Sequence, residues 1–139
     1  MKSLAGVKSC MKKITKDWLD SANSDLLIIE QILSMTHLTH QMAFHAQQAI
    51  EKSFKAVIEE YELGFVKTHT LTLLYSKVHV KASLSLDKNL LILLDQLYID
   101  SRYPGESGLL PNGKPSPVEA KVFFELAKAV YNNITKILQ

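Results

Sequence analysis

Apolar residues recur every three or four positions along most of the chain, which is the spacing of amphipathic helices. The first such segment covers roughly residues 15–34. The stripe that it is expected to bury consists of Ile14, Trp18, Ala22, Leu26, Ile29 and Leu33. A second helix is predicted over 38–62, and Gly64 stands where a C-terminal cap is expected, since glycine tolerates the left-handed conformation found there.

Two further helices follow in the middle of the chain. A short one is predicted over 70–81, with Thr68 or Thr70 as the N-cap. The next covers 86–99 and has a regular leucine pattern. The leucines expected to line its buried side are Leu86, Leu90, Leu93, Leu94 and Leu97.

A turn-rich segment precedes the last helix. The stretch "DSRYPGESGLLPNGKPSP" holds all four prolines and three of the five glycines, which predicts a long loop. The last helix then begins with a capping box, with Ser116 as N-cap, Pro117 at the first position and Glu119 closing the box. Its expected apolar stripe is Val118, Val122, Leu126, Ala129 and Ile137.

These elements predict an all-α protein. No segment alternates with period two for long enough to indicate a strand, and no internal repeat or linker divides the chain. Five helices with connections of mixed length predict an up-and-down four-helix bundle with one additional short helix. We expect residues 1–14 to form a flexible N-terminal tail and residues 15–139 to form a single domain.

Composition and charge narrow the class of protein. The 139 residues are 47% hydrophobic and 22% charged, which is typical of a globular domain. A net charge of +2 is too small to indicate a duplex nucleic-acid binder. The single cysteine, Cys10, excludes an internal disulfide framework and a cysteine-rich zinc site. Without a signal peptide at the N-terminus or an apolar run of about 18 residues, the expected location is the cytoplasm, with no role for a membrane.

The second helix is unusually polar for a central element. Its polar residues fall within one arc, namely Gln41, His45, Gln48, Glu51, Lys52, Lys55 and Glu59. The arc fits a solvated face stabilised by pairs such as Glu51–Lys55, which the pattern alone favours, and a binding site rich in hydrogen-bonding groups is the alternative. Gln47 lies on the apolar side, near Phe54 and Ile58, and is expected to be buried or interfacial. A strip of small residues, Ala49, Ser53 and Ala56, would let another helix approach closely.

Four short motifs resemble the HEPN family (higher eukaryote and prokaryote nucleotide-binding domains). They are "WLDSANSDL" at 18–26, "FHAQQAIEKSFKA" at 44–56, "KTHTL" at 67–71 and "SRYP" at 101–104. Their order and spacing cover most of the chain, from about 15 to 138. The resemblance implies an all-α bundle, often a homodimer, and frequently a genetic partnership with a minimal nucleotidyltransferase.

Some HEPN proteins are metal-independent ribonucleases, so the resemblance requires a search of this sequence for their catalytic motif. Their motif is an arginine followed, after four to six residues, by a histidine. The only arginine of this chain is Arg102, and the three candidate positions are Ser107, Gly108 and Leu109. The chain therefore lacks the familiar ribonuclease motif, and we assign no catalytic residue.

The remaining candidate site is a binding site. On the second helix it consists of His45, Gln48, Lys52 and Lys55; Arg102 and Tyr103 join it from the fourth motif; and Asp25, Glu51 and His69 support it. Lysines attract phosphate, Arg102 can grip an anion with two hydrogen bonds, and Tyr103 can stack on a base. In the alternative structural interpretation, Arg102 pairs with a bundle carboxylate such as Asp25, and His69 orients the turn before the third helix.

The favoured hypothesis is a non-catalytic HEPN protein that binds a nucleotide, with ATP as one candidate, or a minimal nucleotidyltransferase partner within a toxin–antitoxin type of system. One alternative is an RNA-cleaving toxin with His45 as base and Arg102 as phosphate clamp. Another is a plain dimeric interaction module. We expect no cofactor and no metal, since His37 and His40 have no evident third ligand. The loop 101–116 is expected to fold over the bundle end near the second helix.

Overall fold

The computed structural model describes residues 11–102 and 114–139, and the side chains of 99–102 are not described. Within these ranges every regular element is a helix. The α-helices are α1 (Lys13–Ile32), α2 (Thr39–Glu60), α3 (Leu71–Val78), α4 (Lys88–Arg102) and α5 (Pro117–Leu138), with a short 3₁₀ helix, η1 (Thr36–Leu38), before α2. The predicted all-α class with five helices is confirmed. The first ten residues of the expected tail, Cys10 included, lie outside the described residues.

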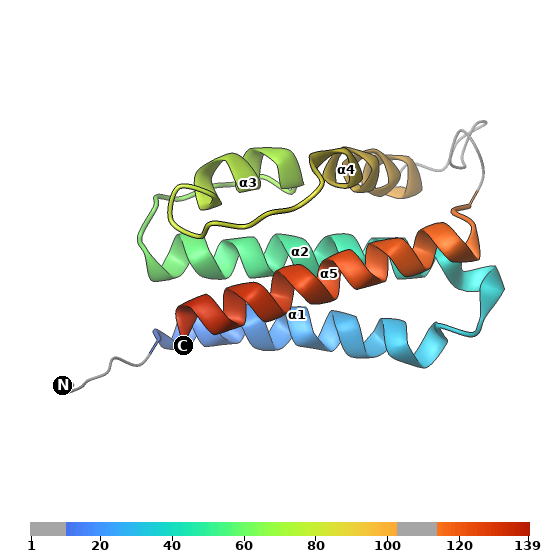
Figure 1. Ribbon diagram of the computed structural model, residues 1–139, viewed down its shortest axis with the longest axis horizontal. Coiled ribbons are helices and arrows are strands. Elements are labelled where there is room, and N and C mark those ends of the chain that lie inside the picture. Colours follow the sequence, from blue (N-terminus) through green and yellow to red (C-terminus); the bar gives the residue numbers. More distant parts are fainter. Residues whose placement is uncertain (1–10, 103–113) are drawn as a thin grey trace.

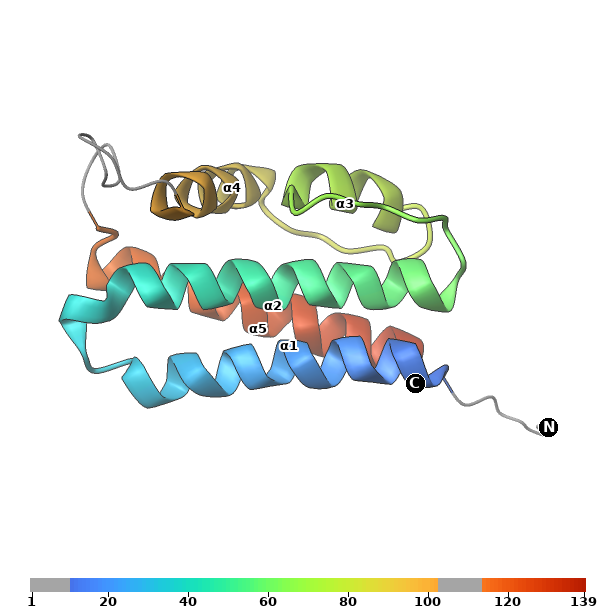
Figure 2. The same cartoon turned by 180° about the vertical axis from the view of Figure 1, so that it is seen from behind.

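Helix α2 occupies the centre of the molecule. Figures 1 and 2 show α1 and α5 running along one side of α2, while α3 and α4 lie along its opposite side. The end of α5 lies beside the start of α1 in both views. The connection after α2 runs back over α2 before α3 begins, so residues 61–70 lie against the central helix (Figure 2). This is the predicted bundle, with α3 as the short additional helix.

The core is built around α2, on which apolar side chains face both groups of helices. Its buried residues include Ile50, Phe54 and Val57, each with no exposed surface. The small residues Ala49 and Ser53 are also fully buried, as is Ala56. This strip therefore packs against other helices of the same chain, and it is not available as a dimer interface.

Helices α1 and α4 bury only part of the stripes expected of them. In α1, Ala22, Leu26 and Ile29 are buried, but Ile14 and Leu33 near its ends are exposed. In α4 the expected Leu94 is fully buried, whereas Leu93 is 50% exposed. Leu91, which the pattern did not select, is fully buried in its place. The prediction for Leu93 was wrong because α4 contributes a narrower apolar stripe than its leucine content suggests.

The stripe expected on α5 was wrong except for Leu126, which is partly buried against the core. Val118 is 74% exposed, Val122 is 43% exposed, and Ala129 and Ile137 are exposed as well. The side that packs on the bundle consists of Ala120, Phe123, Phe124, Ala127, Val130, Ile134 and Leu138. Both sides of this helix carry apolar residues at helical spacing, and the two phenylalanines bury more area than the valines. The predicted capping box of Ser116 and Glu119 is confirmed.

Helix α2 ends in a Schellman motif centred on a glutamate, and not on the expected Gly64. The N–H of Leu63 donates to the carbonyl of Ile58 at 2.9 Å, and the N–H of Glu62 donates to Glu59 at 3.3 Å. Glu62 has a φ of 51°, the left-handed conformation that this position requires. Gly64 lies two residues further on with a φ of 102°, so it shapes the connection and does not cap the helix.

The start of α3 is capped by a residue from another helix. Thr70 is the N-cap residue, as one of the two expected options, but its side chain forms no cap hydrogen bond. The carboxylate of Asp95 on α4 instead accepts from the N–H groups of Leu71, at 2.7 Å, and Thr72, at 3.3 Å. Thr68 accepts from the N–H of Thr70 at 3.1 Å. The negative charge of Asp95 also suits the positive end of the α3 dipole.

None of the helices in the described part of the chain is both long and apolar enough to span a membrane.

Candidate functional site

The polar arc of α2 is not a solvated face. Glu51, in the middle of the arc, is 4% exposed, and the side chains of Lys52 and Lys55 are 22% and 17% exposed. The arc lies between α1 and the connection 61–70, and both contribute partners to it. The interpretation as a solvated surface is therefore wrong for these three residues, although the predicted Glu51–Lys55 pair is present at 2.7 Å.

Asp25 on α1 organises one half of the site. Its side chain is 7% exposed. One carboxylate oxygen contacts Nδ1 of His45 at 2.8 Å, and the other accepts a hydrogen bond from Nζ of Lys52 at 2.7 Å. Both partners come from α2, so the carboxylate joins α1 to the central helix. A carboxylate this deeply buried is stable only with such partners.

Glu51 on α2 organises the other half in the same way. Its carboxylate accepts from Nζ of Lys55 at 2.7 Å and contacts Nδ1 of His69 at 2.9 Å. Gln47 adds a third hydrogen bond through Nε2 at 3.2 Å. Each of the two buried carboxylates thus holds one lysine and one histidine. We call Asp25, His45, Gln47, Gln48, Glu51, Lys52, Lys55 and His69 the carboxylate cluster.

Gln47 and Gln48 connect the two halves to the chain that follows α2. Nε2 of Gln47 donates to the backbone carbonyl of His69 at 2.9 Å, and its oxygen accepts from Nε2 of Gln48 at 2.7 Å. Gln47 is fully buried, as predicted. His69 is fixed through both its ring and its carbonyl, which agrees with the expectation that it orients the turn before α3. Gln47 was not selected as a site residue from the sequence. Its expected burial could have indicated it, because a buried amide needs hydrogen-bond partners.

Two aromatic rings border the cluster. Phe44 on α2 and Tyr98 on α4 are stacked with ring centroids 6.0 Å apart, and Tyr98 lies 5.7 Å from the ring of His69. Phe44 also meets the ring of His45 edge-on, at 5.2 Å. Neither Phe44 nor Tyr98 was selected from the sequence, because their proximity to the histidines depends on how α4 packs.

The expected contributions of the fourth motif lie outside what the structure describes. Arg102 ends α4, which therefore continues beyond the predicted boundary at 99, but its side chain is not described. The loop predicted over 101–116 begins later than expected, because residues 101–102 belong to α4, and residues 103–113, Tyr103 included, lie outside the described residues. Residues 114–116 are described. In that part, Nζ of Lys114 donates to the backbone carbonyl of His37 at 2.9 Å.

Histidines outside the cluster do not form a metal centre in the described ranges. No group of three or more His, Cys, Asp or Glu residues able to hold a metal ion occurs among residues 11–102 and 114–139. His40, one of the pair singled out from the sequence, has a buried Nδ1 atom without a hydrogen-bond partner. Burial lowers the pKa of His40, and the nearby charges of Lys114 and His37 lower it further.

The cluster can recognise an anion without losing its own contacts. An ammonium group has three N–H donors. Lys52 and Lys55 each use one donor on a cluster carboxylate, which leaves donors available to a ligand. The contacts of His45 and His69 are made through Nδ1, so Nε2 of each ring is directed elsewhere. On α2, the four residues His45, Gln48, Lys52 and Lys55 share one side of the helix.

The fold and the cluster define an all-α helical-bundle domain with a charged site on its central helix. The chain belongs to the HEPN family, since the family's domain model matches residues 15–138. None of the curated proteins matches it. The crystal structure of TT1696 from Thermus thermophilus is similar, with a TM-score of 0.72 at 21% sequence identity, and the match covers 91% of this chain and 100% of that one. At this identity the similarity supports the fold alone.

Proposed function

We propose that this HEPN-domain protein is a non-catalytic binding protein that holds the phosphate groups of a nucleotide at the carboxylate cluster. The observation that carries the proposal is the pairing of each buried carboxylate with one lysine and one histidine. Asp25 and Glu51 fix the positions of Lys52 and Lys55 before any ligand arrives. Preorganised donors lose little conformational entropy on binding, which favours a phosphate ligand.

Titration calorimetry with ATP, GTP, CTP and UTP tests the proposal. We expect saturable binding of at least one nucleotide, and on the order of tenfold weaker binding by Lys52→Gln. Glutamine keeps a donor for Asp25, so the fold survives while the charge is removed. Lys16→Gln is the matched control, because Lys16 is an exposed lysine of α1 that pairs only with Asp20. Absence of saturable binding, or equal binding by Lys52→Gln, would reject the proposal.

The cellular role that we propose is partnership with a minimal nucleotidyltransferase in a toxin–antitoxin type of system, with the chain acting as a homodimer. This part rests on family membership and not on a contact of the described residues. Co-purification with the product of a neighbouring gene, followed by light scattering of the complex, tests it. A chain that stays monomeric at high micromolar concentration and purifies without a partner would argue against both associations.

One observation favours RNA cleavage as a second candidate. The 2.8 Å contact between His45 Nδ1 and the buried Asp25 is the arrangement that orients a histidine and leaves Nε2 to accept a proton. Incubation with single-stranded and structured RNA in the presence of a chelator distinguishes the two functions. Cleavage that is lost in His45→Ala would replace the binding proposal, and intact RNA at equimolar protein would reject the second candidate.

A further inference from the structure

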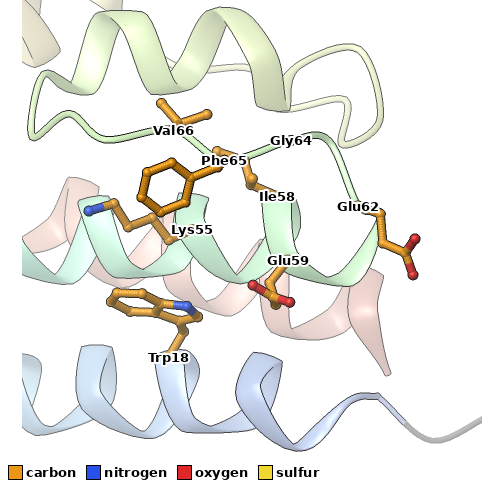
Figure 3. Close-up of a pocket in the computed structure, with 8 residues that line it drawn as sticks. All are labelled: Trp18, Lys55, Ile58, Glu59, Glu62, Gly64, Phe65 and Val66. Atoms are coloured by element: carbon orange, nitrogen blue, oxygen red, sulfur yellow. The ribbon is translucent and has the colours of Figure 1, made fainter.

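A cavity separate from the main part of the carboxylate cluster lies near the other end of α2. Its volume is about 340 Å³, and it lies between α1, the last turns of α2 and the connection that follows. Figure 3 shows Trp18 of α1 on one side and Phe65 on the opposite side, with Lys55 between them. The remaining lining residues are Ile58, Glu59, Glu62, Gly64 and Val66. We call this space the aromatic cavity.

The charges around the aromatic cavity favour a cation. The carboxylate of Glu59 accepts no hydrogen bond and forms no ion pair within the described ranges, and Figure 3 shows it on the side of Trp18. Nearby Lys12 is already engaged, because its ammonium group bonds to the Glu62 carboxylate at 2.8 Å and to the Glu59 carbonyl at 3.0 Å. Among the described lining residues the one lysine is Lys55, which gives one of its donors to Glu51 at 2.7 Å. A phosphate would meet the charge of Glu59 here and be repelled.

The aromatic rings favour the same kind of ligand. The ammonium group of Lys55 lies 5.5 Å from the centre of the Trp18 ring, so a cation already rests against this indole. Phe65 is 90% exposed, the largest exposed fraction among the large apolar side chains described. A small ion would leave the outer surface of Phe65 in water. A larger partner that covers the cavity would bury it, and an aromatic side chain contributes about 150–250 Å² of area.

We propose that the aromatic cavity is a docking site for an arginine side chain carried by an extended segment of a partner protein. The guanidinium group would pair with Glu59 and take the place of the Lys55 ammonium against Trp18, while Lys55 keeps its contact with Glu51. Neighbouring apolar residues of the partner would cover Phe65. Arginine suits the cavity better than lysine, because its planar group stacks on aromatic rings and meets a carboxylate with two parallel hydrogen bonds. Arginine and tryptophan also dominate the binding energy of many protein interfaces. The inference does not depend on nucleotide binding at the carboxylate cluster.

The fluorescence of Trp18, the single tryptophan of the chain, reports directly on the aromatic cavity. The probe is a capped peptide of alternating leucine and arginine, titrated into the wild-type chain. The matched control peptide carries citrulline, which is uncharged and has nearly the shape of arginine. We expect a saturable change in fluorescence with the arginine peptide and at least about tenfold weaker binding of the citrulline peptide.

Variants of the protein test the same contacts. We expect Glu59→Gln to weaken binding of the arginine peptide by about tenfold or more. Phe65→Ala should weaken it as well, and its exposed position means that the fold will be retained. Glu125→Gln is the matched control, since Glu125 is an exposed acid of α5 whose ion-pair partner is Lys128 on the same helix. This variant should bind like the wild type.

Three results would overturn the inference: no saturable change with the arginine peptide, equal binding of the citrulline peptide, or unchanged binding by Glu59→Gln. Free arginine amide that binds as tightly as the peptide would also overturn it, because the occupant would then be a small cation and not a protein segment. The titrations contain no nucleotide, so their failure would leave the proposed phosphate site unaffected. Failure of nucleotide binding would likewise leave the docking site intact.

Discussion

The carboxylate of Asp25 on α1 accepts a hydrogen bond from Nζ of Lys52 on α2 at 2.7 Å, across a sequence separation of 27 residues. The same carboxylate contacts His45, so one buried acid connects α1 to two turns of the central helix. This relationship makes Asp25 a structural residue as well as part of the proposed phosphate site.

Asp25→Ala should lower the free energy of unfolding by about 2–3 kcal/mol, because two partly buried groups lose their charged acceptor. Asp25→Asn should lose less, since the amide keeps one acceptor oxygen. The measurement is urea denaturation followed by circular dichroism. Asp17→Ala is the control, because the ion pair of Asp17 with Lys13 lies on the exposed side of the same helix. Equal stability of the Asp25 and Asp17 variants would show that the buried contact contributes nothing.

Asp95→Ala should destabilise α3 more than the rest of the domain. The carboxylate satisfies the first N–H groups of this helix, and loss of a cap costs about 1–2 kcal/mol. Amide hydrogen exchange should accelerate over 71–78 while the middle of α2 stays protected. Asp95→Asn retains an acceptor and should show a smaller acceleration. Unchanged exchange in α3 after Asp95→Ala would contradict the assigned cap.

Glu62→Gly should make the domain more stable than Glu62→Ala. Both variants lose the ion pair with Lys12, but only glycine adopts the positive φ at this position without strain. We expect the melting temperature of the glycine variant to exceed that of the alanine variant by roughly 3 °C in differential scanning calorimetry. A higher melting temperature for alanine would mean that the left-handed cap is not present in solution.

Acidification should destabilise the protein through His40. Burial lowers the pKa of His40 in the folded state from its ordinary value of 6.5, so the unfolded chain takes up a proton first. Stability should therefore be fully present above pH 6.5 and fall as the pH drops from there toward the folded-state pKa.

Urea denaturation at a series of pH values between neutral and mildly acidic gives the size of this effect. His40→Gln should flatten the decline, because glutamine does not titrate. His79→Gln is the control, since His79 is exposed at the end of α3. An identical decline in wild type and His40→Gln would assign the pH dependence to other groups.

The helical periodicity of the sequence predicts where the helices lie, but it does not select the buried side where a helix is apolar on both sides. In α5, Val118 and Val122 are four residues apart, as are Phe123 and Ala127, and the two stripes are shifted by one position relative to each other. Only the position of the neighbouring helices decides between the two stripes. The capping box of Ser116 is different, because all its groups lie within four consecutive residues and the sequence alone specifies it.

The sequence grouped several of the polar residues that the structure brings together, but it did not give their contacts. His45, Lys52 and Lys55 were selected because they share one side of a helix. The burial of Glu51 depends on His69, which is 18 residues away and arrives only because the chain turns back over α2. Helical spacing describes near neighbours, so it could not decide whether Glu51 faces solvent or a site. The aromatic cavity was missed for the same reason, since Trp18 and Phe65 come from distant segments.

The cap of α3 has a consequence for the order in which the chain acquires its shape during synthesis. Residues 71–78 are synthesised before Asp95, which lies 24 positions after Leu71. A helix of eight residues is unstable by itself in water. The segment therefore gains its cap only when the middle of α4, where Asp95 lies, docks against it. We therefore expect α3 to form later than the longer α2 that precedes it.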